Sequence, residues 1–122
     1  MPEQEKEQRF DVRFADETKK EFRKLGPSAS YEILSTVRKK LTERPSQYGE
    51  PLTRELIGYR KLPVGQWRVV YCVEGNKVLV LVLAVGKRAE GDHENIYDQI
   101  TRDDLGARRK TVLRRVATEE AE

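Results

Sequence analysis

The sequence predicts an α+β fold with an antiparallel-rich four-stranded sheet, an N-terminal helical hairpin packed on one face and a short C-terminal helix. Two observations predict this fold. Apolar residues recur at helical spacing before Pro45, whereas between residues 56 and 85 they alternate or run continuously, as strands do. Strands that cluster after a helical hairpin are typical of a sheet with helices on one face. The length of 122 residues suits a single domain.

The N-terminal part predicts a strand and then a helix. Phe10, Val12 and Phe14 alternate with charged residues, so one face of an extended segment is apolar. We expect Asp16 to cap the following helix through its side-chain oxygen. We expect this helix to end at Gly26, because glycine adopts the left-handed cap conformation without strain.

A second helix is predicted directly after this glycine. Pro27 suits the first helical position, where its missing N–H costs nothing, and Pro45 stops the helix. One face of the helix is expected to be buried, because four apolar residues recur at three- and four-residue spacing: Ile33, Leu34, Val37 and Leu41.

The second half of the chain predicts three consecutive strands, over residues 56–62, 66–74 and 77–85. Gly75 and Asn76 predict a two-residue hairpin turn between the last two strands. The final strand is almost entirely Val and Leu, so we expect it in the centre of the sheet, covered on both faces. A short helix over residues 96–105 and a weak basic helix beyond it complete the prediction.

Composition excludes several classes of protein. The single cysteine, Cys72, excludes an internal disulfide, and with one histidine, His93, it excludes a zinc site of the usual kind. Residues 2–9 are charged rather than apolar, so no signal peptide is expected. The longest apolar run, residues 78–85, is too short to cross a bilayer. We therefore expect a cytoplasmic protein without a membrane partner, a metal or a cofactor.

Positive charge is concentrated in one part of the chain. The formal net charge is +3, yet residues 54–88 carry seven Lys and Arg residues against two Glu residues. A local positive field suits an anionic partner, most commonly a phosphate. The alternative is a solvated surface with scattered cations. Four acids follow, Glu90, Asp92, Glu94 and Asp98; they are expected to face solvent rather than to form a calcium loop.

The cations lie on successive strands of the predicted sheet. Arg60 and Lys61 are on the first strand, Arg68 is on the second, and Lys87 and Arg88 follow the third. Adjacent strands are about 5 Å apart, so side chains from all three can converge on one face. RNA cleavage needs little more than such a site, because the attacking 2′-hydroxyl belongs to the substrate and arginine stabilises phosphate charge. A merely basic sheet surface remains the alternative.

Several of these stretches together resemble the RelE/ParE superfamily, in particular the RelE-type mRNA interferases. The similar stretches are residues 59–62, 66–71 and 78–88, followed by Tyr97, and the likeness covers residues 9–102. The resemblance implies a flexible arm at residues 1–8, a RelE-like toxin domain at residues 9–102 and a charged extension at residues 103–122.

The resemblance also implies roles for individual side chains. Arg68 would stabilise the transition-state phosphate, and Arg88 would bind the scissile phosphate and neutralise the leaving 5′-oxygen. Lys61 would hold the backbone and support proton transfer, and Tyr97 would orient or deprotonate the 2′-hydroxyl. His93 is the alternative to Tyr97 at this position. The remaining RNA-binding residues implied are Arg60, Lys87 and His93.

The function implied is that of a toxin of a type II toxin–antitoxin pair, acting as a ribosome-dependent, metal-independent endoribonuclease on mRNA. The expected partners are an antitoxin protein, the ribosome and mRNA. One alternative is a ParE-like toxin that inhibits DNA gyrase without cutting RNA. Another is an inactive relative that serves as a partner module.

Overall fold

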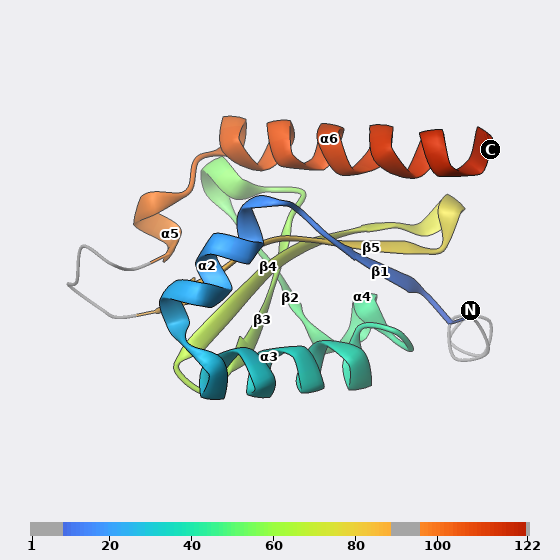
Figure 1. Ribbon diagram of the computed structural model, residues 1–122. Helices are drawn as coiled ribbons and strands as arrows, with labels where there is room; N and C mark the ends of the chain where they lie inside the picture. The colour runs from blue at the N-terminus through green and yellow to red at the C-terminus, as the bar shows by residue number, and fades with distance from the viewer. Residues whose placement is uncertain (1–8, 89–95, 122) are drawn as a thin grey trace.

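The computed structural model describes residues 9–88 and 96–121. Five strands form one mixed sheet in the order β1-β5-β4-β3-β2 (Figure 1). The strands are β1 (Asp11–Phe14), β2 (Glu50–Pro51), β3 (Arg60–Val64), β4 (Trp67–Glu74) and β5 (Leu79–Lys87). Among these described strands only β1 and β5 pair in parallel, so the expected antiparallel-rich sheet is confirmed. The additional strand is β2, whose two residues are too few to give a periodic pattern.

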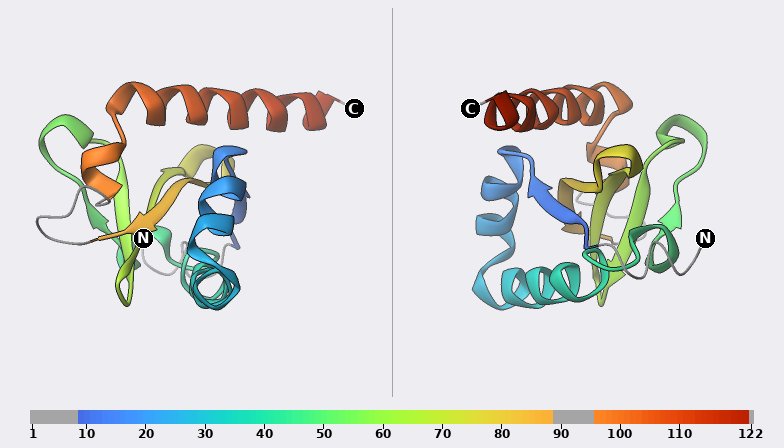
Figure 2. Two further views of the ribbon diagram at one scale, coloured as in Figure 1. Left: turned by 60° about the vertical axis from the view of Figure 1, so that its left-hand side comes forward. Right: turned by 90° about the vertical axis from the view of Figure 1, so that its right-hand side faces the viewer.

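Helices cover both faces of the sheet. Along the chain they are α2 (Glu17–Leu25), α3 (Pro27–Lys40), α4 (Pro45–Tyr48), α5 (Ile96–Gln99) and α6 (Arg102–Ala121), with short 3-10 turns η1 (Arg54–Leu56) and η2 (Gly75–Lys77). Figures 1 and 2 show α3 and α6 on opposite sides of the sheet. The helical hairpin and its Gly26 junction, with φ of 94°, are confirmed.

The face under α3 holds a closely packed apolar core. Val69 and Tyr71 of β4 point into it and are fully buried, as are Ile33 and Val37 of α3. The alternation of β4 in the sequence predicted this arrangement. The residues on the α3 side are Trp67, Val69 and Tyr71, and those on the α6 side are Arg68, Val70 and Cys72. Period-two alternation therefore assigned the two faces of β4 correctly.

The opposite face is covered by α6, which is much longer than the C-terminal helix expected from the sequence. Leu105, Val112 and Val116 of this helix are buried against β5 and its neighbours. The expected helix over residues 96–105 is wrong in its bounds, because α5 ends at Gln99 and α6 begins at Arg102. The sparse spacing of the apolar residues in α6 explains why the sequence predicted only a weak helix.

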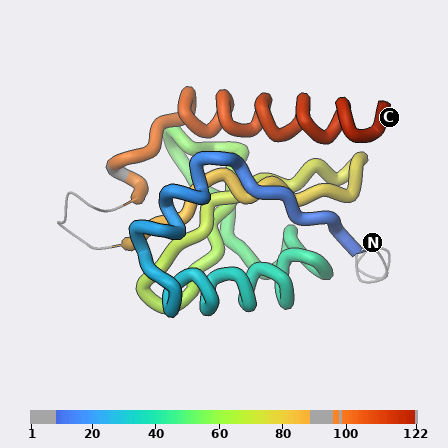
Figure 3. The backbone as a smooth tube through the Cα atoms, in the orientation of Figure 1, coloured from blue at the N-terminus to red at the C-terminus, as the bar shows by residue number. Residues whose placement is uncertain are grey.

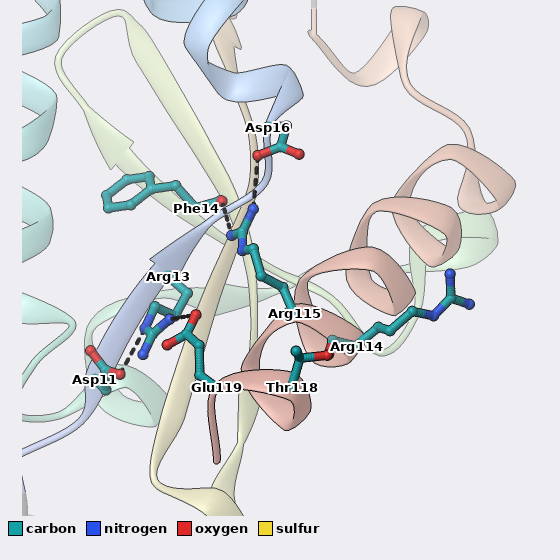
Figure 4. A network of polar contacts seen from close by, with 8 residues as sticks. All are labelled: Asp11, Arg13, Phe14, Asp16, Arg114, Arg115, Thr118 and Glu119. Atoms are coloured by element: carbon teal, nitrogen blue, oxygen red, sulfur yellow. Dashed lines mark hydrogen bonds and ion pairs between the residues drawn. The ribbon is translucent and has the colours of Figure 1, made fainter. Parts of the chain in front are cut away.

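Ion pairs hold α6 to the rest of the domain. Arg108 pairs with Glu21 of α2 at 2.7 Å, and Arg109 pairs with Glu74 of β4 at 2.5 Å. Nearer its C-terminal end, Arg115 pairs with Asp16 at 2.8 Å and Glu119 with Arg13 at 2.9 Å (Figure 4). The tube in Figure 3 shows how the helix runs back over the sheet toward the start of β1. The expected capping role of Asp16 is wrong, because its carboxylate accepts from Arg115 and makes no cap bond.

Two local predictions in the strand region are also wrong. Strand β3 begins at Arg60 rather than at residue 56, and it continues through Pro63. Proline is tolerated there because β2 pairs only with Arg60 and Lys61, so the strand edge beyond them is open. The connection after Glu74 spans four residues rather than two, with the positive φ at Val78 instead of at glycine.

Candidate functional site

Lys61 and Arg68 lie on the same face of the sheet, beside the end of the α6 layer. Lys61 is opposite Val70 in the β3–β4 register, and Val70 belongs to the core under α6. Arg68 precedes Val70 by two residues and therefore points to the same side. The sheet thus brings cations from β3 and β4 together, as the sequence predicted.

A β-bulge determines which basic residue of β5 joins them. Val70 is opposite Ala84 and Tyr71 is opposite Val82, so Leu83 is an extra residue in β5. Leu83 and Ala84 consequently both contact the core under α6. With one extra residue, the side chains of β5 beyond the bulge point to the opposite faces from those that a regular strand would give them.

Beyond the bulge, Gly86 faces the α6 side, where a Cβ at this glycine would lie 2.8 Å from the side chain of Ile96. Arg88 lies two residues after Gly86, so it points to the same face of the sheet. Its backbone N–H donates to the carbonyl of Gln66 at 3.0 Å, which extends the β4–β5 pairing past Lys87. Arg88 therefore projects toward the face that carries Lys61 and Arg68, and its side chain is exposed.

Tyr97 of α5 lies among these three cations. The Nζ atom of Lys61 is 5.9 Å from the centre of its ring. Burial raises the pKa of the Tyr97 hydroxyl, while the positive charges of Arg68 and Arg88 lower it without cancelling the effect of burial. We call Lys61, Arg68, Arg88 and Tyr97 the cationic cluster.

The Arg68 guanidinium is held in place by backbone carbonyls. Its Nη1 donates to the oxygens of Gly65 and Trp67, each at 2.8 Å. A donor fixed in this way loses little conformational freedom when it binds an anion. The β3–β4 turn therefore pre-organises one cation of the cluster.

Glu50 is a residue of this site that the sequence did not indicate. Its carboxylate is 3.7 Å from Lys61 Nζ, directly across the β2–β3 pair, and its negative charge contributes to the raised pKa of Tyr97. Glu50 lies in a segment that the sequence predicted as a loop. A strand of two residues leaves no periodic signal that could have placed it opposite Lys61.

Two other predicted RNA-binding residues, Arg60 and Lys87, lie away from the cationic cluster. Arg60 faces the α3 side, where its Nη2 donates to the carbonyls of Ser46 at 2.9 Å and Gly49 at 2.8 Å. It is therefore not brought to the cationic cluster. Lys87 pairs with Trp67 on that same side and borders a separate cavity of about 380 Å³ beside α2. His93 lies outside the described residues.

Cations in this arrangement suit a phosphate group, because their donors can bond its oxygens. Among residues 9–88 and 96–121, no three His, Cys, Asp or Glu side chains are placed to hold a metal ion. The acids Glu90, Asp92 and Glu94 fall outside the described residues. None of the helices in the described ranges is both long and apolar enough to span a membrane.

Known proteins share much of the sequence and fold of this chain. The family model described as the ParE toxin of type II toxin–antitoxin systems matches residues 9–92. Toxin RelG of Mycobacterium tuberculosis is 28% identical over 81 residues, which cover 66% of this chain and 93% of RelG.

Two solved structures are similar as well. The toxin–antitoxin complex RelBE2 of Mycobacterium tuberculosis contains a chain with a TM-score of 0.64 and 28% identity; the match covers 70% of this chain and 98% of that one. A double arginine-to-alanine mutant of the Escherichia coli toxin RelE in the free state has a TM-score of 0.55 and 26% identity, covering 75% and 99%. The chain therefore belongs to the ParE toxin family of type II toxin–antitoxin systems, within the RelE/ParE superfamily, and its fold is RelE-like.

Proposed function

We propose that this toxin is a ribosome-dependent endoribonuclease that cleaves mRNA by attack of a 2′-hydroxyl on the adjacent phosphate. The observation that carries the proposal is the convergence of Lys61, Arg68 and Arg88 around Tyr97 on one face of the sheet. Three cations drawn from three strands form a site for a phosphate whose charge increases in the transition state.

In the proposed reaction, the 2′-oxygen forms a bond to phosphorus as the bond from phosphorus to the 5′-oxygen breaks. The products are a 2′,3′-cyclic phosphate and a free 5′-hydroxyl; water accepts the proton that the 2′-oxygen loses and supplies the one that the 5′-oxygen gains. Arg68, which is held by two carbonyls, would stabilise the additional negative charge on the phosphate oxygens. Arg88 would bind the scissile phosphate and neutralise the 5′-oxygen as it leaves. Lys61 would hold the backbone and support removal of the 2′-proton.

Burial of Tyr97 favours one of its two expected roles. Its pKa is raised, so the hydroxyl stays protonated at neutral pH. A neutral phenol both donates and accepts hydrogen bonds, so it can orient the 2′-hydroxyl, but it is a poor base. We therefore assign orientation of the attacking group, rather than its deprotonation, to Tyr97.

We further propose that a separate antitoxin chain regulates this activity in the cytoplasm. The similar RelBE2 structure is a toxin–antitoxin complex, and the family is defined by such pairs. The cationic face would suit an acidic segment of that partner.

The test is primer extension on mRNA bound to purified ribosomes. Wild-type protein should produce discrete cleavage positions, and Arg68→Ala should reduce the rate by about a hundredfold or more, the typical effect of removing one transition-state donor. Arg115→Ala is the matched control, since it removes an arginine from α6 and should leave the cleavage pattern unchanged. Intact mRNA with the wild-type protein would exclude the proposal.

The second candidate is inhibition of DNA gyrase, which the match to the ParE family model favours. A supercoiling assay with purified gyrase separates the two functions. Loss of supercoiling without mRNA cleavage would establish the gyrase function and would leave the cationic cluster without a catalytic role. An inactive relative would score negative in both assays.

A further inference from the structure

We propose that a pocket next to the cationic cluster binds a nucleobase of the RNA beside the scissile linkage. The pocket lies between the segment that carries η1 and the junction of α5 with α6, and its volume is about 580 Å³. This inference rests on the proposed function, because it assigns the substrate group that the same site would recognise. The volume is ample for a base that has turned out of its strand.

Tyr97 connects the pocket to the cluster. It borders the pocket, and its ring also lies near the Lys61 ammonium, 5.9 Å from the ring centre. A phosphate bound by Arg68 and Arg88 would therefore have the neighbouring base beside Tyr97, at the entrance to the pocket. Adjacent nucleotides of one strand would then occupy the cluster and the pocket together.

The chemistry of the pocket walls suits a nucleobase. Leu52, Leu56 and Ile100 supply apolar surface, which matches the faces of a base. The exposed carboxylates of Glu55 and Asp103 stand at the border and can accept hydrogen bonds from the amino groups of a base. Uracil has no amino group, so we expect it to bind most weakly of the four bases.

The walls are held by fixed interactions, so the pocket is formed before a ligand arrives. The Arg102 guanidinium donates to the carbonyls of Ile57 and Glu55 and lies 5.6 Å from the ring centre of Tyr59. At the start of α6, the Thr101 and Asp104 side chains each accept the other's backbone N–H at 3.1 Å. Pre-organisation of this kind lowers the entropic cost of binding.

The backbone at Arg54 gives further support. This residue borders the pocket with φ of 58°, in the left-handed region that side chains other than glycine rarely adopt. Strained residues of this type concentrate at ligand sites, where the surrounding structure maintains them.

Segments from two distant parts of the chain line the pocket. The C-terminal part of the described chain supplies one wall of the pocket, through Tyr97, Ile100, Arg102 and Asp103. The C-terminal segment therefore contributes a recognition surface as well as a structural layer.

The experiment measures binding of 2′-O-methyl trinucleotides, which have no free 2′-hydroxyl and cannot be cleaved. Homotrimers of A, C, G and U are titrated into isotopically labelled protein and followed by NMR. We expect shifts at the backbone amides of Thr53 and Asp103, with the U trimer weakest. Thr53→Trp fills the pocket and should weaken binding by about tenfold or more, the loss typical of removing one stacked base. Thr36→Trp, at a partly exposed position of α3, is the matched control.

The inference is wrong if Thr53→Trp binds the trimers as well as Thr36→Trp does, or if shifts occur only around Arg68 and Arg88. Absence of binding by the folded wild-type protein would also overturn it. Asp103→Asn should alter the order of base preference while keeping the melting temperature, which separates recognition from folding. Failure of the proposed function has a different signature: ribosome-bound mRNA stays intact while trimer binding at the pocket persists.

Discussion

The cationic cluster and helix α6 are both rich in basic residues. Three arginines of α6 form ion pairs at 2.5 to 2.8 Å. Their partners are the carboxylates of Glu21 in α2, Glu74 in β4 and Asp16 just before α2. In the cluster, Lys61 has a carboxylate at 3.7 Å, on a Glu50 side chain that is 68% exposed. The same residue types therefore hold the fold together in one region and gather around a tyrosine in the other.

The difference comes from what each region faces. The arginines of α6 lie where the helix crosses the sheet, and there they meet acids and unpaired backbone groups. Arg108 also donates to the Leu83 carbonyl at 2.9 Å, beyond the point where the β1–β5 pairing ends. The cations of the cluster lie where the cover of α6 ends. Basic residues thus have a structural role in α6, where acids surround them, whereas in the cluster they surround the ring of Tyr97.

The largest expected effect tests the assignment of Arg88 rather than Lys87 to the cluster. Arg88→Ala should lower mRNA cleavage by about a hundredfold or more, because a phosphate ligand is lost. Lys87→Ala should change cleavage by less than about threefold, since the bulge turns Lys87 to the other face. Single-turnover cleavage on ribosomes measures both. Equal losses in the two variants would mean that the bulge does not select between them.

A second prediction concerns the structural role of α6. Arg108→Ala leaves Glu21 without its arginine and the Leu83 carbonyl without its donor, so the free energy of unfolding should fall by about 2 kcal/mol. Urea denaturation followed by circular dichroism measures the loss. Arg114→Ala, on the exposed side of the same helix, is the control and should change it by less than about 0.5 kcal/mol. If Arg108→Ala changed the free energy of unfolding as little as Arg114→Ala does, the arginines of α6 would have no structural role to set against the cationic cluster.

A large part of this comparison could be predicted from the sequence. Alternation in residues 66–74 placed Arg68 opposite the main apolar set, and strand order brought Lys61 and Arg68 together. The bulge at Leu83 could not be predicted, because a continuous Val and Leu run has no polar residue to mark a change of phase. Glu50 and the packing of α6 were missed for a related reason: both depend on contacts between distant segments, which leave no local pattern.

A third prediction uses the raised pKa of Tyr97. The raised pKa means that the folded state favours the neutral phenol, so this contribution to stability is present below about pH 10 and is lost at higher pH. The difference in phenolate absorbance between wild type and Tyr97→Phe should titrate above the ordinary tyrosine value. Arg88→Ala should raise the midpoint further, because it removes a neighbouring positive charge. A midpoint below the ordinary tyrosine value would show that the cations outweigh burial at this site.

The smallest expected effect concerns the ion pair between Arg115 and Asp16, at 2.8 Å near the C-terminal end of α6. Both side chains are partly exposed, so a double-mutant cycle of Arg115→Ala and Asp16→Ala should give a coupling of about 0.5 kcal/mol that decreases at high salt. Arg115 also donates to the Phe14 carbonyl at 2.9 Å, so its single mutant should cost more than that of Asp16. Because the pair lies far along the helix from Tyr97, cleavage should be unaffected in all three variants. A loss of cleavage in Arg115→Ala alone would mean that α6 supports the cluster along its whole length, and the two basic regions would then act as one unit.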